Sequence, residues 1–176
     1  TSLVWLAGLT MAVAAGCGGG DDSPPPLSSG GGGTGGSGPG GATASGPSRG
    51  SAIALTEDDS IAVSVNRDSG SVSVFSINYS SGTPQMMRTA EVAVGAEPWE
   101  VALHPDGDTA FVVVRRDQKL VKITGLKTTP TVAGSVATGS EPTAVALTPS
   151  GAHAWVTNWV DGTVLGIDTA TMAVKS

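Results

Sequence analysis

The sequence predicts an all-β repeat protein. Three observations support this fold class: a residue pattern recurs along the chain, short β-branched runs are separated by turn residues, and no segment has the apolar spacing of a helix. The pattern recurs about every 44 residues, a period typical of repeat architectures in which each unit packs on its neighbours. We therefore expect a body built of similar sheets, each covering the next.

The clearest repeat unit runs from Glu141 to Asp168, and the same pattern fits the chain twice more. A shift of about 44 positions places Glu141 on Glu97 and Pro149 on Pro105. A further copy lies upstream at a shift of about 48 positions, with the extra residues absorbed in a loop. The expected units are residues 51–95, 96–139 and 140–176.

Each unit divides into four short strands, which the middle unit shows most clearly. Between its first two strands stands the turn Pro105-Asp106-Gly107, in which Pro fixes φ, Asp can bond its own backbone and Gly accepts positive φ. Four antiparallel strands at this period describe one blade of a β-propeller. The strands of the middle unit are expected at residues 99–104, 109–114, 119–124 and 131–137.

Composition separates the N-terminal part of the chain from the repeats. The chain has 176 residues and a formal net charge of −6, which argues against nucleic acid as a partner. Residues 18–50 consist mainly of Gly, Ser and Pro and offer almost no apolar side chain to bury. We expect this segment to be a disordered tether ahead of the repeats at 51–176.

Residues 2–16 form an apolar run that is too short for a membrane span and suits the core of a signal peptide. The run ends in Ala14-Ala15-Gly16-Cys17, which resembles the bacterial lipobox. Residues 1–17 are therefore interpreted as a lipoprotein signal with Cys17 as the lipidated residue. An ordinary secretory signal with a chance cysteine is the alternative. The lipid would anchor the protein in a bacterial cell envelope, at the outer membrane or cell surface of a Gram-negative host because Gly18 follows the cysteine.

A family resemblance rests on the third unit, which contains Trp155-Val156-Thr157-Asn158 followed by Ile167-Asp168. With Pro149, Gly151 and Val164, this pattern resembles the repeat of the YVTN-family β-propeller proteins, with Trp where the family has Tyr. The resemblance implies an exported or surface propeller, usually of seven blades, with relatives among lactonases and redox-enzyme subunits. Because the chain starts without Met and ends inside its third unit, we expect it to be a fragment of such a ring.

Candidate ligand-contacting residues lie on loops that this fold brings to one face. Glu97 and Glu141 are expected either to present carboxylates there or to bond turn amides. The arginines either bind an anionic ligand or are solvated loop charges, and Trp159 is an exposed aromatic suited to a sugar or partner. The candidates are Arg67, Glu97, Arg115, Arg116, Glu141 and Trp159.

Trp155 is assigned to the core between blades. Because each blade covers its neighbour, the third unit should nevertheless leave an apolar face open if no neighbour is present. The residues expected on that open face are Val145, Leu147, Trp155, Val156 and Val164.

Residue chemistry supports no catalytic, metal or cofactor assignment within these residues. His104 and His153 lack metal-site spacing, each being expected at a turn edge, and no nucleophile stands beside a base. The leading hypothesis is a lipid-anchored propeller that serves as a scaffold for a protein or small-molecule ligand. The alternative is the propeller part of an enzyme, either a lactonase-like hydrolase or a redox protein containing haem, with catalytic residues beyond Ser176.

Overall fold

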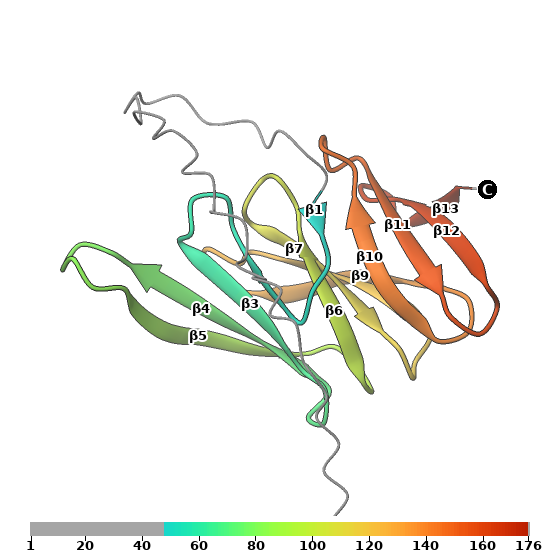
Figure 1. Cartoon of the computed structure of the whole chain (residues 1–176), viewed down its shortest axis with the longest axis horizontal. Helices are drawn as coiled ribbons and strands as arrows, with labels where there is room; N and C mark the ends of the chain where they lie inside the picture. The colour runs from blue at the N-terminus through green and yellow to red at the C-terminus, as the bar shows by residue number, and fades with distance from the viewer. Residues whose placement is uncertain (1–47, 176) are drawn as a thin grey trace, which may run out of the picture. The chain divides into compact units, whose positions relative to one another are not determined.

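The computed structural model describes residues 48–175, and all its regular elements are strands (Figure 1). The signal segment and most of the tether lie outside the described residues. Three antiparallel sheets follow one another along the chain, and we call them blades 1 to 3. Blade 1 contains β2 (Ile53–Leu55), β3 (Ile61–Asn66), β4 (Ser71–Asn78) and β5 (Gln85–Ala93). Blade 2 contains β6 (Pro98–Leu103), β7 (Thr109–Val114), β8 (Lys119–Thr124) and β9 (Thr131–Ala137).

Blade 3 contains β10 (Pro142–Leu147), β11 (His153–Asn158), β12 (Thr163–Asp168) and β13 (Ala173–Lys175). A further short strand, β1 (Ser48–Arg49), pairs with β10. The predicted fold class, an all-β propeller of four-stranded blades, is confirmed. In blade 2 the last three strands have the predicted bounds, and β6 begins one residue earlier than expected. The repeats were expected to begin at residue 51, whereas Ser48 and Arg49 already belong to the third sheet.

The turn between β6 and β7 has the hydrogen bonds and the positive φ that its residues predict. Asp106 Oδ1 accepts hydrogen bonds from the backbone amides of Asp108 at 2.8 Å and Thr109 at 2.9 Å. Partial burial of Asp106 opposes ionisation, but these bonds prevail and hold the pKa of its carboxyl below the usual value. Gly107 has φ 65°, which a side chain would disfavour. His104 lies at the edge of this turn, with its Nδ1 3.0 Å from Asp106 Oδ2.

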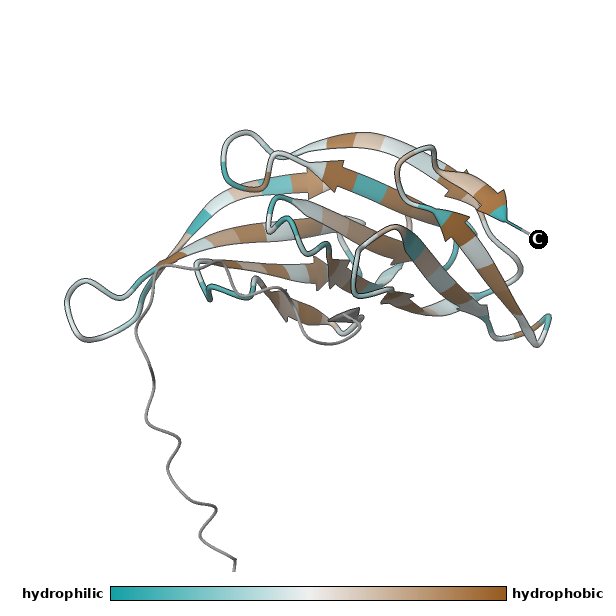
Figure 2. Cartoon of the chain, turned by 90° about the horizontal axis from the view of Figure 1, so that it is seen from above, coloured by the Kyte–Doolittle hydropathy of each residue, from teal (hydrophilic) through white to brown (hydrophobic). Residues whose placement is uncertain are grey.

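Two apolar cores hold the blades together, and blade 2 contributes to both. Along β7, Val112 and Val114 face blade 1, whereas Phe111 and Val113 face blade 3. Successive side chains of a strand point to opposite sides of its sheet, so a strand covered on both sides is apolar throughout. Every residue of β7 is buried for this reason. Figure 2 shows the apolar residues along the strands.

The outer side of blade 3 corrects two expectations. Trp155 was assigned to the core, but it is 49% exposed, whereas Phe111, at the equivalent position of blade 2, is 0% exposed. Both residues lie on the side that faces the next blade, and only Phe111 has blade 3 against it. The expected open face does include Trp155 and Val164. The prediction was wrong for Val145, Leu147 and Val156, which point the other way and are buried against blade 2.

We predict that Phe111→Ala lowers the free energy of unfolding by about 3–5 kcal/mol, because it empties the core between blades 2 and 3. Trp155→Ala is the matched control at the equivalent position of blade 3. It should cost about 1 kcal/mol or less because the ring is half exposed. Urea denaturation followed by circular dichroism measures both values. Equal losses would contradict the difference in burial.

Candidate functional site

Loops from all three blades meet on one face, as the repeat pattern predicts. The loops between the second and third strands lie beside the connections that enter blades 2 and 3. Backbone hydrogen bonds hold these segments together, since the amide of Arg115 donates to the carbonyl of Glu97 and the amide of Trp159 to that of Glu141, each at 2.9 Å. In blades 2 and 3, the entering connection is therefore held against the loop between the second and third strands of the same blade.

Four of the candidate residues form an alternating series of charges across the blades. Arg67 pairs with Glu97, whose Oε1 also lies 3.4 Å from Arg115 Nη1. Arg115 Nη2 is 2.5 Å from Glu141 Oε2. We call this series, Arg67–Glu97–Arg115–Glu141, the charge ladder. It joins blade 1 to blade 2 and blade 2 to blade 3.

An aromatic side chain supports the ladder. The guanidinium carbons of Arg67 and Arg115 lie 4.4 and 4.8 Å from the centre of the Trp99 ring, within the range of cation–π contact. The hydrogen bond to Glu141 raises the pKa of Arg115, with further contributions from the charges of Glu141 and Glu97. Both arginines are thus held by partners within the protein.

The turn amides are bound by other carboxylates. Asp117 Oδ2 accepts a hydrogen bond from the amide of Ala96 at 3.1 Å, and Asp161 Oδ2 accepts one from the amide of Ser140 at 2.5 Å. The hypothesis that Glu97 and Glu141 bond these amides is therefore not supported by their side-chain contacts. Both glutamates instead turn the backbone through positive φ, 61° and 49°, and pair with arginines.

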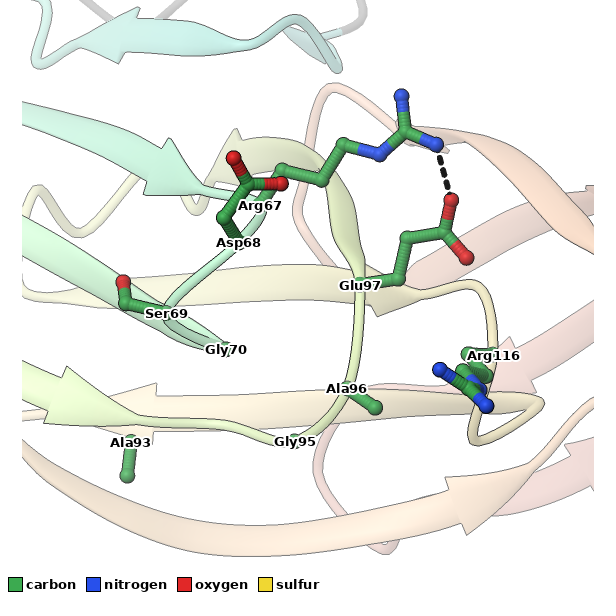
Figure 3. Close-up of a pocket in the computed structure, with 9 residues that line it drawn as sticks. All are labelled: Arg67, Asp68, Ser69, Gly70, Ala93, Gly95, Ala96, Glu97 and Arg116. Carbon is green, nitrogen blue, oxygen red and sulfur yellow. Dashed lines mark hydrogen bonds and ion pairs between the residues drawn. The ribbon is translucent and has the colours of Figure 1, made fainter.

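A pocket of about 660 Å³ opens beside the ladder (Figure 3). It lies between the β3–β4 loop of blade 1 and the connection into blade 2, with Arg116 reaching it from the next loop. A second hollow of about 270 Å³ shares Glu97 and Arg116 with the first. The larger pocket is lined by Arg67, Asp68, Ser69, Gly70, Ala93, Gly95, Ala96, Glu97 and Arg116.

Two charged residues of the larger pocket stand apart from the ladder. Among the side chains that the structure describes, neither Asp68 nor Arg116 has an ion-pair partner, whereas the charges of Arg67 and Glu97 are matched to each other. Arg116 lines both hollows. The pocket therefore presents one guanidinium and one carboxylate that are not engaged in a salt bridge with a described side chain.

The structure places the candidate residues from the sequence in different parts of the loop face. Arg67, Glu97, Arg115 and Glu141 are gathered into the ladder, and Arg116 lies between the two hollows. Trp159 is 74% exposed and lines neither hollow. It occupies the loop position that Arg115 holds in blade 2, so the alternation ends at Glu141 in the described part of the chain. Cys17 lies outside the described residues.

Sequence reasoning missed Trp99, Asp68 and the two amide-binding aspartates. Asp117 and Asp161 recur at the repeat spacing, so the repeat itself could have revealed them. Trp99 has Thr143 as its counterpart and left no such signal. Asn158 and Asp168 also accept hydrogen bonds from backbone amides, Asn158 from Gly139 and Asp168 from Ala170 and Thr171.

Neither a metal-type cluster of His, Cys, Asp and Glu side chains nor a helix able to cross a membrane occurs between residues 48 and 175. The loop face carries guanidinium and carboxylate groups. These groups bind anions and polar substrates, and they can take up or stabilise charge during a reaction.

A protein-family model described as lactonase, 7-bladed β-propeller matches residues 37–124, half of the chain. The chain belongs to this family. The matched segment includes every residue that lines the larger pocket. No curated protein matches the chain.

Solved structures show the same fold at low sequence identity. A putative 6-phosphogluconolactonase from Bacteroides fragilis is 20% identical with a TM-score of 0.60, over 70% of this chain and 36% of that one. The periplasmic gluconolactonase PpgL of Pseudomonas aeruginosa is 20% identical with a TM-score of 0.57, over 70% and 37%. Hydrazine synthase of Kuenenia stuttgartiensis is 23% identical with a TM-score of 0.59, over 70% and 33%. The chain aligns with about a third of each of these lengths.

We predict that Arg115→Ala destabilises the protein more than Arg116→Ala does, because Arg115 bridges two blades and Arg116 has no ion-pair partner among the described residues. The loss should include coupling to Glu141, which a double-mutant cycle with Glu141→Gln isolates. Thermal unfolding at low and high salt measures both effects, and the difference should shrink as salt screens the charges. Identical melting temperatures for the two single variants would count against the ladder as a contact between blades.

Proposed function

We propose that the chain forms part of a lactonase-type hydrolase that opens the ring of a sugar-derived lactone at the loop-face pocket. The observation that carries this proposal is the family match, which spans the residues that line the pocket. Two structural neighbours bear the names 6-phosphogluconolactonase and gluconolactonase, which agrees with the same chemistry. The family match favours this alternative over the scaffold that the sequence alone placed first.

The pocket chemistry suits such a reaction. In lactone hydrolysis, water adds to the carbonyl carbon, the ring C–O bond breaks, and a hydroxy acid forms. A carboxylate can take the proton from the attacking water, and a cation can stabilise the negative oxygen that develops. We assign these roles to Asp68 and Arg116, the pocket's two charged groups outside the ladder.

The charge ladder has a positioning role in this proposal. It fixes the connection that carries Glu97 and the loop that carries Arg115, which is adjacent to Arg116. A group held by a rigid frame can be aimed at the reacting atom without reorganisation during the reaction. The ladder itself is charge-matched, so its arginines are less suited than Arg116 to binding a substrate oxygen.

The purified protein should accelerate the hydrolysis of glucono-δ-lactone above its spontaneous rate, measured as proton release in a weakly buffered indicator solution. Arg116→Ala and Asp68→Asn should each lower kcat/KM by about tenfold or more, the loss expected when a charge-stabilising or proton-transferring group is removed. Arg88→Ala is the control, since Arg88 pairs with Glu91 and does not line the pocket. No acceleration, or equal effects of all three variants, would refute this assignment.

We also propose that this YVTN-type repeat body is exported and held at a membrane by a lipid on Cys17. The support lies in the order of segments: an apolar run, the small residues before Cys17, and the Gly- and Ser-rich segment before the repeats. A flexible coil of this kind would lift the body off the lipid head groups. More than one acyl chain is needed for stable anchoring.

Radiolabelled palmitate should enter the protein in a bacterial host, and Cys17→Ala should abolish the label and release the protein from the membrane fraction. The matched control is Ser23→Ala, which should leave both unchanged because it lies beyond the lipobox. If the Cys17→Ala protein stayed in the membrane fraction, a lipid anchor at this residue would be excluded.

A further inference from the structure

Residues 48–51 cross the inner edges of two blades, and we call them the strap. Ser48 pairs with Leu147 and Arg49 with Ala146 in β10. The amide of Gly50 donates to the carbonyl of Val145 at 2.8 Å. Ser51 then exchanges two backbone hydrogen bonds with Val101 in β6, at 3.1 and 2.8 Å. The strap thus passes from blade 3 to blade 2 before the chain enters blade 1.

The strap occupies backbone edges that would otherwise be unpaired. β6 is the end strand of its sheet, and β10 would be the end strand of blade 3 without β1. Edge strands present rows of free N–H and C=O groups that accept an additional strand. Ser51 and the following Ala52 are exposed, so apolar burial contributes little at this point. Backbone hydrogen bonds therefore hold the strap on this edge.

Gly50 is the most closely fitted residue of the strap. A Cβ atom at this position would lie 2.6 Å from Glu100 Oε2 and 2.8 Å from the carbonyl oxygen of Val145. Contacts that short do not occur, so a side chain at residue 50 would push the strap off the edge. Glu100 also accepts a hydrogen bond from the Val145 amide at 3.1 Å, and burial raises the pKa of its carboxyl. The strap therefore lies directly over this carboxylate.

We propose that the inner edges of β6 and β10 form a strand-addition site, and that the strap is its displaceable ligand within the chain. The site accepts an extended peptide with glycine at the position that meets Glu100. Backbone pairing supplies the affinity, as in other cases of recognition by strand addition. The lack of room for a side chain at the position of Gly50 supplies the specificity. A strap held by a few backbone bonds can leave while the blades remain packed. This proposal is independent of hydrolase activity.

The test uses two strap variants of the full chain and one control. Gly50→Val introduces a side chain where there is no room for one, and Ser51→Pro removes the amide that donates to the carbonyl of Val101. Gly134→Ala is the matched control, since its Cβ would have Met172 Cγ at 3.8 Å as its nearest neighbour. In both strap variants, hydrogen exchange at the Val101 amide should quicken at least tenfold, whereas exchange at Val112 in the core should not change. The control should behave like the unaltered protein at both amides.

A fluorescein-labelled peptide with the sequence of residues 46–53 provides the second measurement. It should bind the Gly50→Val protein in fluorescence anisotropy and bind the unaltered protein far less, because the strap competes. The same peptide carrying Gly50→Val should bind neither. Unchanged exchange at Val101 in both strap variants, or no peptide binding to Gly50→Val, would overturn the proposal. Loss of the folded state in both variants would also overturn it, since a displaceable strap is not required for the fold.

Discussion

The apolar contact of blade 2 with both of its neighbours is the constraint on which the rest of the structure depends. β7 lies in the middle of it, with Val112 packed toward blade 1 and Phe111 toward blade 3. The hydrogen bonds of the four strands run within a blade, so side-chain packing, a few loop contacts and the strap fix the blades relative to one another. These two cores therefore determine how the loops of the loop face, with its pocket and ladder, are placed relative to one another.

The ladder shows how a repeat can pair charges within the protein, between one blade and the next. A repeated glutamate before the first strand of a blade meets an arginine from the blade before it, so each pair crosses a junction. Arg115 serves two carboxylates at once, Glu97 of its own blade and Glu141 of blade 3, and so links the pair at one junction to the pair at the other. Pairs with exposed side chains contribute little individually, but a network with an aromatic support orders the loops around the pocket.

The repeat period was sufficient to predict the strands, the turns and the shared face of the loops, because each depends on local residue order. It could not predict which side of blade 3 is covered. Trp155 has the same alternation as Phe111, and only the presence or absence of a neighbouring sheet separates their burial. The pairing of Glu97 with Arg67 and the packing of Arg67 on Trp99 were also beyond reach, since they join residues of different repeats.

The bonds from Asp117 and Asp161 to backbone amides have a consequence for how this face can diversify. The four-residue loops of blades 2 and 3 are fixed at their third positions, by Asp117 and Asp161, while the second position projects from a frame that does not depend on it. That second position is Asp68, Arg116 and Val160 in the three blades: an acid, a base and an apolar residue. Substitution there can change the chemistry of the loop face blade by blade, while the backbone that presents it stays the same in blades 2 and 3.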